Sequence, residues 1–111
     1  MRYVVTGGRN NNNIEAVNKA ISELPDDAVI VNGGAKGIDA LCAIVAKKRG
    51  LRVETFNAEW EKYGMAAGPI RNAKMLENAD YLIAFYGGKG TADCVKQATS
   101  KGIPIIEAEG E

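Results

Sequence analysis

The stretch "YLIAFYGGKGTADC" (residues 81–94) passes from a strand pattern, through a glycine turn, into a helix pattern. Its first part, "YLIAF" (81–85), is short and almost wholly apolar, which is typical of a buried β-strand. Gly87, Gly88 and Gly90 follow directly. Because each glycine costs roughly 0.5–1 kcal/mol of chain entropy, three glycines within four residues require an explanation. Either the turn is tight, or its backbone must come close to an anion.

The same order of strand, glycine turn and helix recurs along the chain. Strands are predicted at 2–6, 28–31, 52–56, 81–85 and 103–107, and helices at 14–24, 38–49, 69–76 and 91–101. Continuous apolar strands that alternate with helices predict a parallel sheet covered on both faces. With right-handed crossovers this is a Rossmann-like α/β fold: a three-layer sandwich whose mainly parallel five-stranded sheet has the order 3-2-1-4-5. Pro104 favours an edge position for the last strand.

Composition limits both the size of the protein and its chemistry. The 111 residues are enough for one domain, which we expect to span residues 1–111. Fourteen basic and fourteen acidic side chains give a formal net charge of zero, so the bulk positive field of many nucleic-acid binders is missing. The chain has no histidine, which excludes a histidine base, a histidine metal ligand and a Ser–His pair.

The cysteines and the hydropathy pattern suggest where the protein works. Cys42 and Cys94 both lie in helix patterns, and the first predicted strand begins at Arg2, which leaves no room for a targeting peptide. We therefore expect free thiols in a reducing compartment. No apolar run approaches the ~20 residues of a membrane span. A cytoplasmic protein without membrane contact is the prediction.

Paired glycines follow three of the predicted strands: Gly7-Gly8, Gly33-Gly34 and Gly87-Gly88. The carboxyl ends of parallel strands share one rim of the sheet, where ligands of such folds bind. "NGGAKGIDA" (32–40) and "YGGKGTADC" (86–94) also share the order Gly-Gly, Lys-Gly, helix, with an aspartate expected in the first helical turn. Unpaired amides at a helix N-terminus attract anions, so we predict phosphate binding at this rim.

Lys36 and Lys89 would add charge to this rim, and Thr91 would add a hydroxyl donor. Gly-x4-Gly-Lys-Ser/Thr is absent, as is Gly-x-Gly-x-x-Gly after the first strand. Asp39 and Asp93 have two interpretations. A carboxylate in the first helical turn is stabilised by the helix dipole and can cap amides, or it can accept hydrogen bonds from ribose hydroxyls.

The segment "GPIRN" (68–72) predicts a helix entry with Arg71 in its first turn. An arginine is unfavourable at that end of a helix, which a bound phosphate or carboxylate would explain. The other interpretation is a surface ion pair with Glu77 or Asp80. Trp60 and Tyr63, just upstream, are either caps of the core or a stacking platform for a base.

Four segments in order, "VTGGRN", "NGGAKGIDALCA", "AEWEKYGMAAGPIRNAKML" and "AFYGGKGTADCV", resemble the YspA/YpsA-like branch of the SLOG superfamily, over nearly the whole chain. The resemblance implies a Rossmann-like domain that binds a nucleotide-type ligand at the glycine turns. Relatives include the LOG phosphoribohydrolases, the DprA/Smf DNA-processing proteins and sensor domains for ADP-ribose-type signals. By the same analogy we expect a homodimer or a homotetramer.

LOG enzymes carry Pro-Gly-Gly-x-Gly-Thr-x-x-Glu with a catalytic final glutamate. Here Tyr86 stands at the proline position and Cys94 at the glutamate position, and Asp93 lies one residue short, about 100° round the helix. "GGAKGID" and "GPIRN" are similar to DprA segments, but we expect no counterpart of the DprA accessory domain within these 111 residues.

We therefore expect a binding module, a sensor or a sequestering protein, for a nucleotide or ADP-ribose-like molecule. The alternatives are an N-glycosidic hydrolase that uses Asp93 or Asp39, and an accessory protein for single-stranded DNA. No metal and no cofactor is predicted. The expected ligand-binding residues are Thr6, Gly7, Gly8, Arg9, Gly33, Gly34, Ala35, Lys36, Gly37, Asp39, Trp60, Gly68, Pro69, Arg71, Asn72, Gly87, Gly88, Lys89, Gly90, Thr91 and Asp93.

Overall fold

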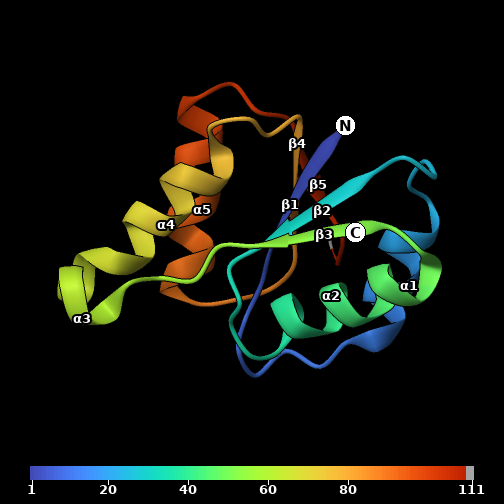
Figure 1. Ribbon diagram of the computed structural model, residues 1–111, viewed down its shortest axis with the longest axis horizontal. Helices are drawn as coiled ribbons and strands as arrows, with labels where there is room; N and C mark the ends of the chain where they lie inside the picture. Colours follow the sequence, from blue (N-terminus) through green and yellow to red (C-terminus); the bar gives the residue numbers. More distant parts are fainter. Residues whose placement is uncertain (110–111) are drawn as a thin grey trace.

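The computed structural model, which describes residues 1–109, contains one five-stranded sheet. All of its neighbouring strands pair in parallel, in the order β3-β2-β1-β4-β5, as predicted (Figure 1). The strands are β1 (Arg2–Thr6), β2 (Val29–Asn32), β3 (Arg52–Thr55), β4 (Tyr81–Ala84) and β5 (Ile105–Glu107). Pro104 precedes β5, which lies at an edge of the sheet.

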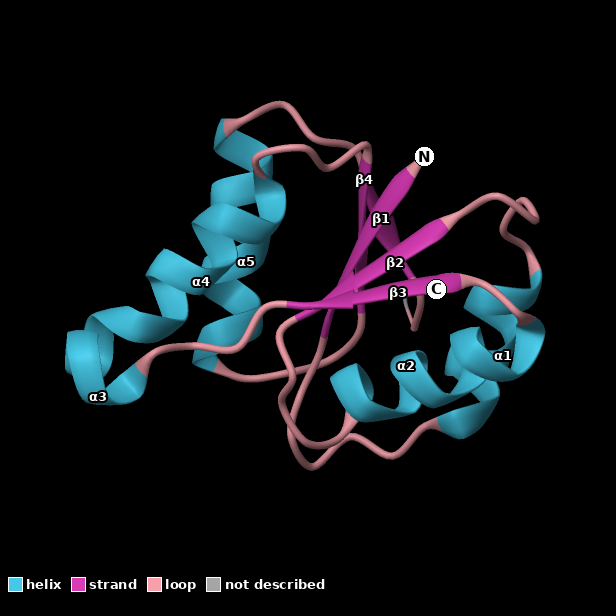
Figure 2. Cartoon of the chain, viewed as in Figure 1, coloured by secondary structure: helices cyan, strands magenta, loops and turns pink. Residues whose placement is uncertain are grey.

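Helices cover both faces of the sheet, which gives the three layers (Figure 2). The helices α1 (Ile14–Ser22) and α2 (Ile38–Arg49) pack together on one face, and α4 (Ala67–Leu76) and α5 (Lys89–Ser100) pack together on the other. The irregular segment before α4 contains the one-turn helix α3 (Trp60–Tyr63) and a 3₁₀ turn (Gly64–Ala66). Within residues 1–109, no helix combines the length and the apolar character that crossing a bilayer requires.

The three inner strands β1, β2 and β4 bury side chains on both faces, which explains their continuous apolar runs. Successive side chains of a strand point to opposite faces. In β1, Tyr3 and Val5 belong to the core under α1 and α2, whereas Val4 belongs to the core under α4 and α5. Ile30 and Val31 of β2 divide in the same way.

Two helices begin earlier than the sequence pattern indicated. The helix α4 begins at Ala67, so Pro69 is its third residue; a proline fits there because first-turn amides have no partner within the helix. The helix α5 begins at Lys89 and includes Gly90, a poor helix former. Arg71 and Asp93 therefore lie in the second turns of their helices, and the prediction of first-turn positions for both was wrong.

The order of the strands determines where a crevice opens at the carboxyl-end rim of the sheet. Strand β1 lies between β2 and β4, with Val4 paired to Val31 on one side and to Leu82 on the other. The chain continues from β1 into α1 on one face of the sheet and from β4 into α5 on the other, so a crevice opens beyond the carboxyl ends of β1 and β4. The turns that follow β1, β2 and β4 all reach this crevice.

Candidate functional site

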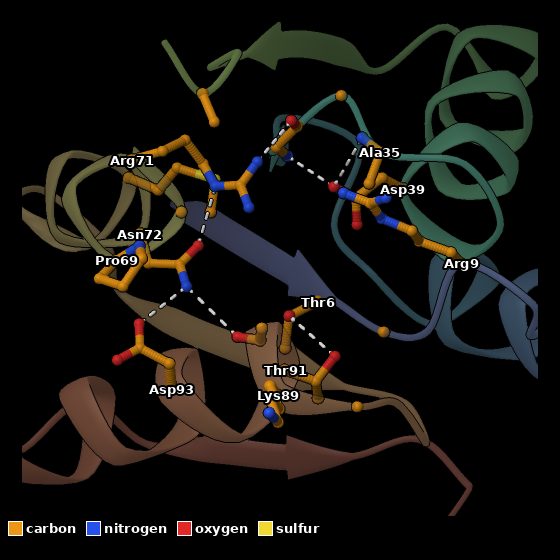
Figure 3. Close-up of a pocket in the computed structure, with 18 of the residues that line it drawn as sticks. Thr6, Arg9, Ala35, Asp39, Pro69, Arg71, Asn72, Lys89, Thr91 and Asp93 are labelled. Atoms are coloured by element: carbon orange, nitrogen blue, oxygen red, sulfur yellow. Dashed lines mark hydrogen bonds between the residues drawn. The ribbon is translucent and has the colours of Figure 1, made fainter. Parts of the chain in front are cut away.

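A cavity of about 710 Å³ lies at the rim where the three glycine turns meet (Figure 3). Its walls come from the ends of β1 and β2, the first turns of α4 and α5, and the segment that contains α3. The volume is in the range of about 300–1,000 Å³ that is typical of small-molecule pockets.

The structure brings nearly all of the predicted binding residues to this cavity. Those that line it are Thr6, Gly7, Gly8, Arg9, Gly33, Gly34, Ala35, Lys36, Asp39, Trp60, Gly68, Pro69, Arg71, Asn72, Gly88, Lys89, Gly90, Thr91 and Asp93. Gly37 and Gly87 do not line it, and the neighbours of each give the reason. A Cβ on Gly37 would meet the carbonyls of Gly8 and Arg9, and one on Gly87 would meet the hydroxyl of Thr91. Both glycines let the turns pack against each other.

The β2–α2 turn (residues 33–37) is held by hydrogen bonds from within the chain. The Oδ2 atom of Asp39 accepts from the amides of Gly33 at 2.8 Å and Ala35 at 3.3 Å. The Oδ1 atom of Asn32 accepts from the amide of Gly34 at 2.8 Å. The amides of residues 33–35, which the sequence suggested for phosphate, therefore already have acceptors.

The β4–α5 turn (residues 87–91) is open on the cavity side. The amides of Lys89, Gly90 and Thr91 donate no hydrogen bond to any of residues 1–109. A Cβ built on Gly88 or on Gly90 would have no atom within 4 Å beyond its own local backbone. Gly88 has a φ of −97°, which other residues also adopt. Glycine at 88 and 90 thus serves no packing need among the described residues.

Arg71 bridges α4 and the β2–α2 turn. Its Nη1 donates to the carbonyl of Gly33 at 2.7 Å, and its Nε donates to Oδ1 of Asn72 at 2.9 Å (Figure 3). No acidic side chain among residues 1–109 forms an ion pair with it, so the alternative of a surface pair with Glu77 or Asp80 was wrong. Its Nη2 makes no hydrogen bond in the described chain, and the side chain lines the cavity.

Asp39 and Asp93 line the same cavity from opposite helices. Burial raises the pKa of Asp39 above its usual value, although the amides of Ala35 and Gly33 and the charge of Arg71 oppose that rise. Asp39 lies in the first turn of α2, as predicted, but it caps loop amides rather than helix amides.

Asp93 is held on one side. Its Oδ2 accepts from Nδ2 of Asn72 at 3.0 Å and from Nε2 of Gln97 at 2.8 Å. The Oδ1 atoms of both aspartates have no hydrogen-bond partner among residues 1–109, and neither is a fully buried, unpartnered atom. One oxygen of each carboxylate therefore remains able to accept a hydrogen bond from a molecule in the cavity.

Comparison with known proteins gives the family. The model of the "YspA, cpYpsA-related SLOG family" matches residues 1–63, more than half of the chain. The chain belongs to this SLOG family. It is also 35% identical over 119 aligned positions to the Gene 61 protein of Mycobacterium phage D29, with 95% of this chain and 94% of the phage protein covered.

Two crystal structures share the SLOG fold. The structural genomics target TM1055 matches with a TM-score of 0.77 and 22% identity, over 98% of this chain and 74% of its own. DNA processing protein A from Streptococcus pneumoniae matches with a TM-score of 0.64 and 18% identity, over 95% of this chain and 58% of its own. At these identities the likeness shows the fold alone.

The position of the LOG glutamate faces the core in this SLOG protein. Cys94 is fully buried and does not line the cavity. Burial raises the pKa of its thiol to about 11, so the group is neutral near pH 7. Asp93, one residue earlier, is the acid that α5 presents to the cavity. Cys42 is also a buried free thiol, as expected.

The aromatic residues upstream of α4 divide between two places. Trp60 is 50% exposed and lines the cavity, so it is not a cap of the core. Tyr63 borders a second, smaller cavity of about 310 Å³ instead.

Sequence reasoning missed several residues near the rim. Asn57, Ala58 and Met65 line the large cavity, and Met65 is 95% exposed. Asn57 directly follows the β3 region, at the same end of the sheet, which is a signal that could have found it. Met65 lies in the 3₁₀ turn and carries no comparable sequence signal. Among residues 1–109, no group of three or more His, Cys, Asp or Glu side chains is placed to hold a metal ion.

Proposed function

We propose that the chain binds a phosphorylated, nucleotide-type small molecule in the rim cavity and acts as a sensor or a sequestering module. The observation that carries this proposal is the β4–α5 turn. There, Gly88 and Gly90 have open space where a side chain would be, and three first-turn amides have no acceptor in the described chain. A phosphate would occupy that space and accept from those amides.

Charge at the cavity favours an anion. Arg9, Lys36 and Lys89 line it and form no ion pair within residues 1–109. Arg71 brings a fourth positive charge and one unengaged Nη2. The two acids of the cavity each have one oxygen saturated by donors from the chain. The N-terminus of α5 adds about half a positive charge.

The remaining parts of a nucleotide have matching partners. The unengaged Oδ1 atoms of Asp39 and Asp93 suit ribose hydroxyls, because a carboxylate only accepts hydrogen bonds. The half-exposed ring of Trp60, with the exposed thioether of Met65, would contact the base.

The proposal is tested by what the protein carries when it is purified. Small molecules released on denaturation are identified by mass spectrometry, for the native chain and for Gly88→Val prepared in parallel. The valine enters open space at an ordinary φ, so the fold is expected to survive. We expect a phosphorylated nucleoside derivative from the native chain and none from Gly88→Val. Equal amounts from both would remove this turn from the site.

The second candidate is an N-glycosidic hydrolase, because two carboxylates line one cavity. Cleavage would need a carboxylate fixed beside a cationic sugar, and no histidine is available to activate water. We expect no free base from nucleoside monophosphates, ADP-ribose or NAD after long incubation, as measured by chromatography. Base release that disappears in Asp93→Asn would establish the hydrolase instead.

A further inference from the structure

Glu109 lies outside the cavity, yet its side chain joins two of the segments that form the cavity wall. We propose that Glu109 is a positioning residue, which holds the β4–α5 turn in the conformation that accepts phosphate. This inference rests on the proposed function of that turn.

The carboxylate of Glu109 accepts three hydrogen bonds from two different segments. Its Oε1 accepts from Nδ2 of Asn11 at 2.7 Å and from the amide of Tyr86 at 2.8 Å, and its Oε2 accepts from Nδ2 of Asn13 at 2.7 Å. The hydroxyl of Tyr86 in turn donates to the backbone carbonyl of Glu109 at 2.9 Å. The segment after β5 is thus bonded to both the β1–α1 loop and the β4–α5 turn.

Tyr86 is the fixed point of this network. Its carbonyl accepts from the amide of Gly8 at 2.9 Å and from Nδ2 of Asn11 at 3.0 Å. Tyr86 is 66% exposed, so packing does little to hold it. Hydrogen bonds to Glu109, Asn11 and Gly8 therefore fix the backbone of the residue that directly precedes Gly87-Gly88.

The turn needs such a fixed point because glycine loses more conformational freedom on ordering than other residues do. Unpaired amides bind an anion well only when they already converge on one place, since otherwise binding must supply the cost of ordering them. The helix α5 fixes one end of the turn, and the bonds at Tyr86 fix the other. Glu109 supplies a charged acceptor at that end.

The test compares AMP with adenosine as probes, in the native chain and in Glu109→Ala. Affinities and the shifts of the Gly88, Lys89 and Gly90 amide resonances are measured by NMR titration. Glu107→Ala is the matched control, because Glu107 is an exposed acid two residues earlier whose side chain makes no hydrogen bond within residues 1–109. Glu109→Gln keeps the shape and one accepting oxygen, so it tests rescue and remains informative if the alanine variant does not fold.

We expect Glu109→Ala to weaken AMP about three- to tenfold, part of the roughly 10- to 150-fold that a lost charge-assisted contact can cost. Adenosine should change less than twofold, Glu109→Gln should fall between, and Glu107→Ala should match the native chain. Unchanged AMP affinity in Glu109→Ala, or an equal loss for AMP and adenosine, would overturn the positioning role alone. Absence of AMP-induced shifts at residues 88–90 of the native chain would overturn the proposed function and this inference with it.

Discussion

The β2–α2 turn and the β4–α5 turn have similar sequences, but their backbone amides differ in whether they have acceptors within the chain. Both contain Gly-Gly and Lys-Gly after a strand, although the Lys-Gly of the second already belongs to α5, and both reach the same cavity. In the β2–α2 turn, Asp39 and Asn32 accept from the amides of residues 33–35. In the β4–α5 turn, the amides of residues 89–91 have no acceptor among residues 1–109. The amides of the first turn have acceptors within the protein, whereas those of the second are the ones that we propose bind a ligand.

The glycines of the two turns differ in whether the fold requires them. Gly34 and Gly37 have φ values of +72° and +75°, and a Cβ on either would meet atoms of the chain. These two glycines are required by the fold. Gly88 and Gly90 have neither constraint among the described residues. In the proposed function, the open space beside them is where a phosphate would lie.

The largest expected effect is on stability, in the β2–α2 turn. Gly37→Ala forces a Cβ against the carbonyls of Gly8 and Arg9 at a positive φ, so we expect a loss of about 3 kcal/mol or more. Gly90→Ala replaces a helical glycine in open space, and it should raise stability by about 0.5–1 kcal/mol while weakening AMP. Urea denaturation of both variants gives the free energies of unfolding.

The two substitutions are identical in chemistry, so each is the control for the other. Similar destabilisation by both would mean that Gly90 also serves the fold, and the contrast between the turns would be lost.

A smaller effect is expected at Arg71, which both bonds the β2–α2 turn and lines the cavity. Arg71→Ala removes the unengaged Nη2 from the cavity, so AMP should weaken about tenfold or more while adenosine changes little. Arg52→Ala, which removes an exposed guanidinium on the edge strand β3, should leave both affinities unchanged. Calorimetric titration of the native chain and both variants with AMP and with adenosine measures these affinities. An equal loss for AMP and adenosine in Arg71→Ala would assign Arg71 to support of the β2–α2 turn through Gly33.

The smallest effects are those of pH, and the acids beside the two turns should give opposite signs. Burial raises the pKa of Asp39 above 3.8 in the folded protein. The contribution of Asp39 to the free energy of unfolding is therefore fully present below pH 3.8, and it is lost as the pH rises through the pKa of Asp39 in the folded protein. For Glu109, burial raises the pKa, but hydrogen bonds from Tyr86, Asn13 and Asn11 outweigh it, and the pKa lies below 4.5. Its stabilisation is present above pH 4.5 and is lost as the pH falls through the folded pKa.

Unfolding of the native chain, Asp39→Asn and Glu109→Gln from about pH 3 to pH 7 checks these signs. The native chain should lose stability relative to Asp39→Asn as the pH rises. Relative to Glu109→Gln, it should lose stability as the pH falls. The same sign for both differences would contradict the assignment of the two carboxylates.

The fold could be predicted from the sequence because its signals are local and repeated. The apolar strand runs, the helical spacing and Gly50 at a left-handed helix end each limit one element, and connection rules then fix the order of the sheet. Helix starts were less predictable. Pro69 and Gly90 interrupt the helix pattern, yet both are tolerated in first turns, where amides have no partner within the helix.

The place of the cavity could be predicted from the sequence, but the difference between its two glycine turns could not. That difference depends on contacts between distant residues, such as Arg71 with Gly33 and Glu109 with Tyr86. The matching Gly-Gly and Lys-Gly patterns even suggested equal roles. Only the positions of Asp39 and Asn32 show that one of the two turns already has its acceptors.

The most direct test of the central claim is an NMR titration of the native chain with AMP that follows the backbone amides of both turns. If phosphate binds at the open turn, the resonances of Lys89, Gly90 and Thr91 should shift strongly, because their N–H groups gain an acceptor. Those of Gly33, Gly34 and Ala35, which already donate to Asn32 and Asp39, should shift little. Strong shifts at residues 33–35 with none at residues 89–91 would contradict the claim.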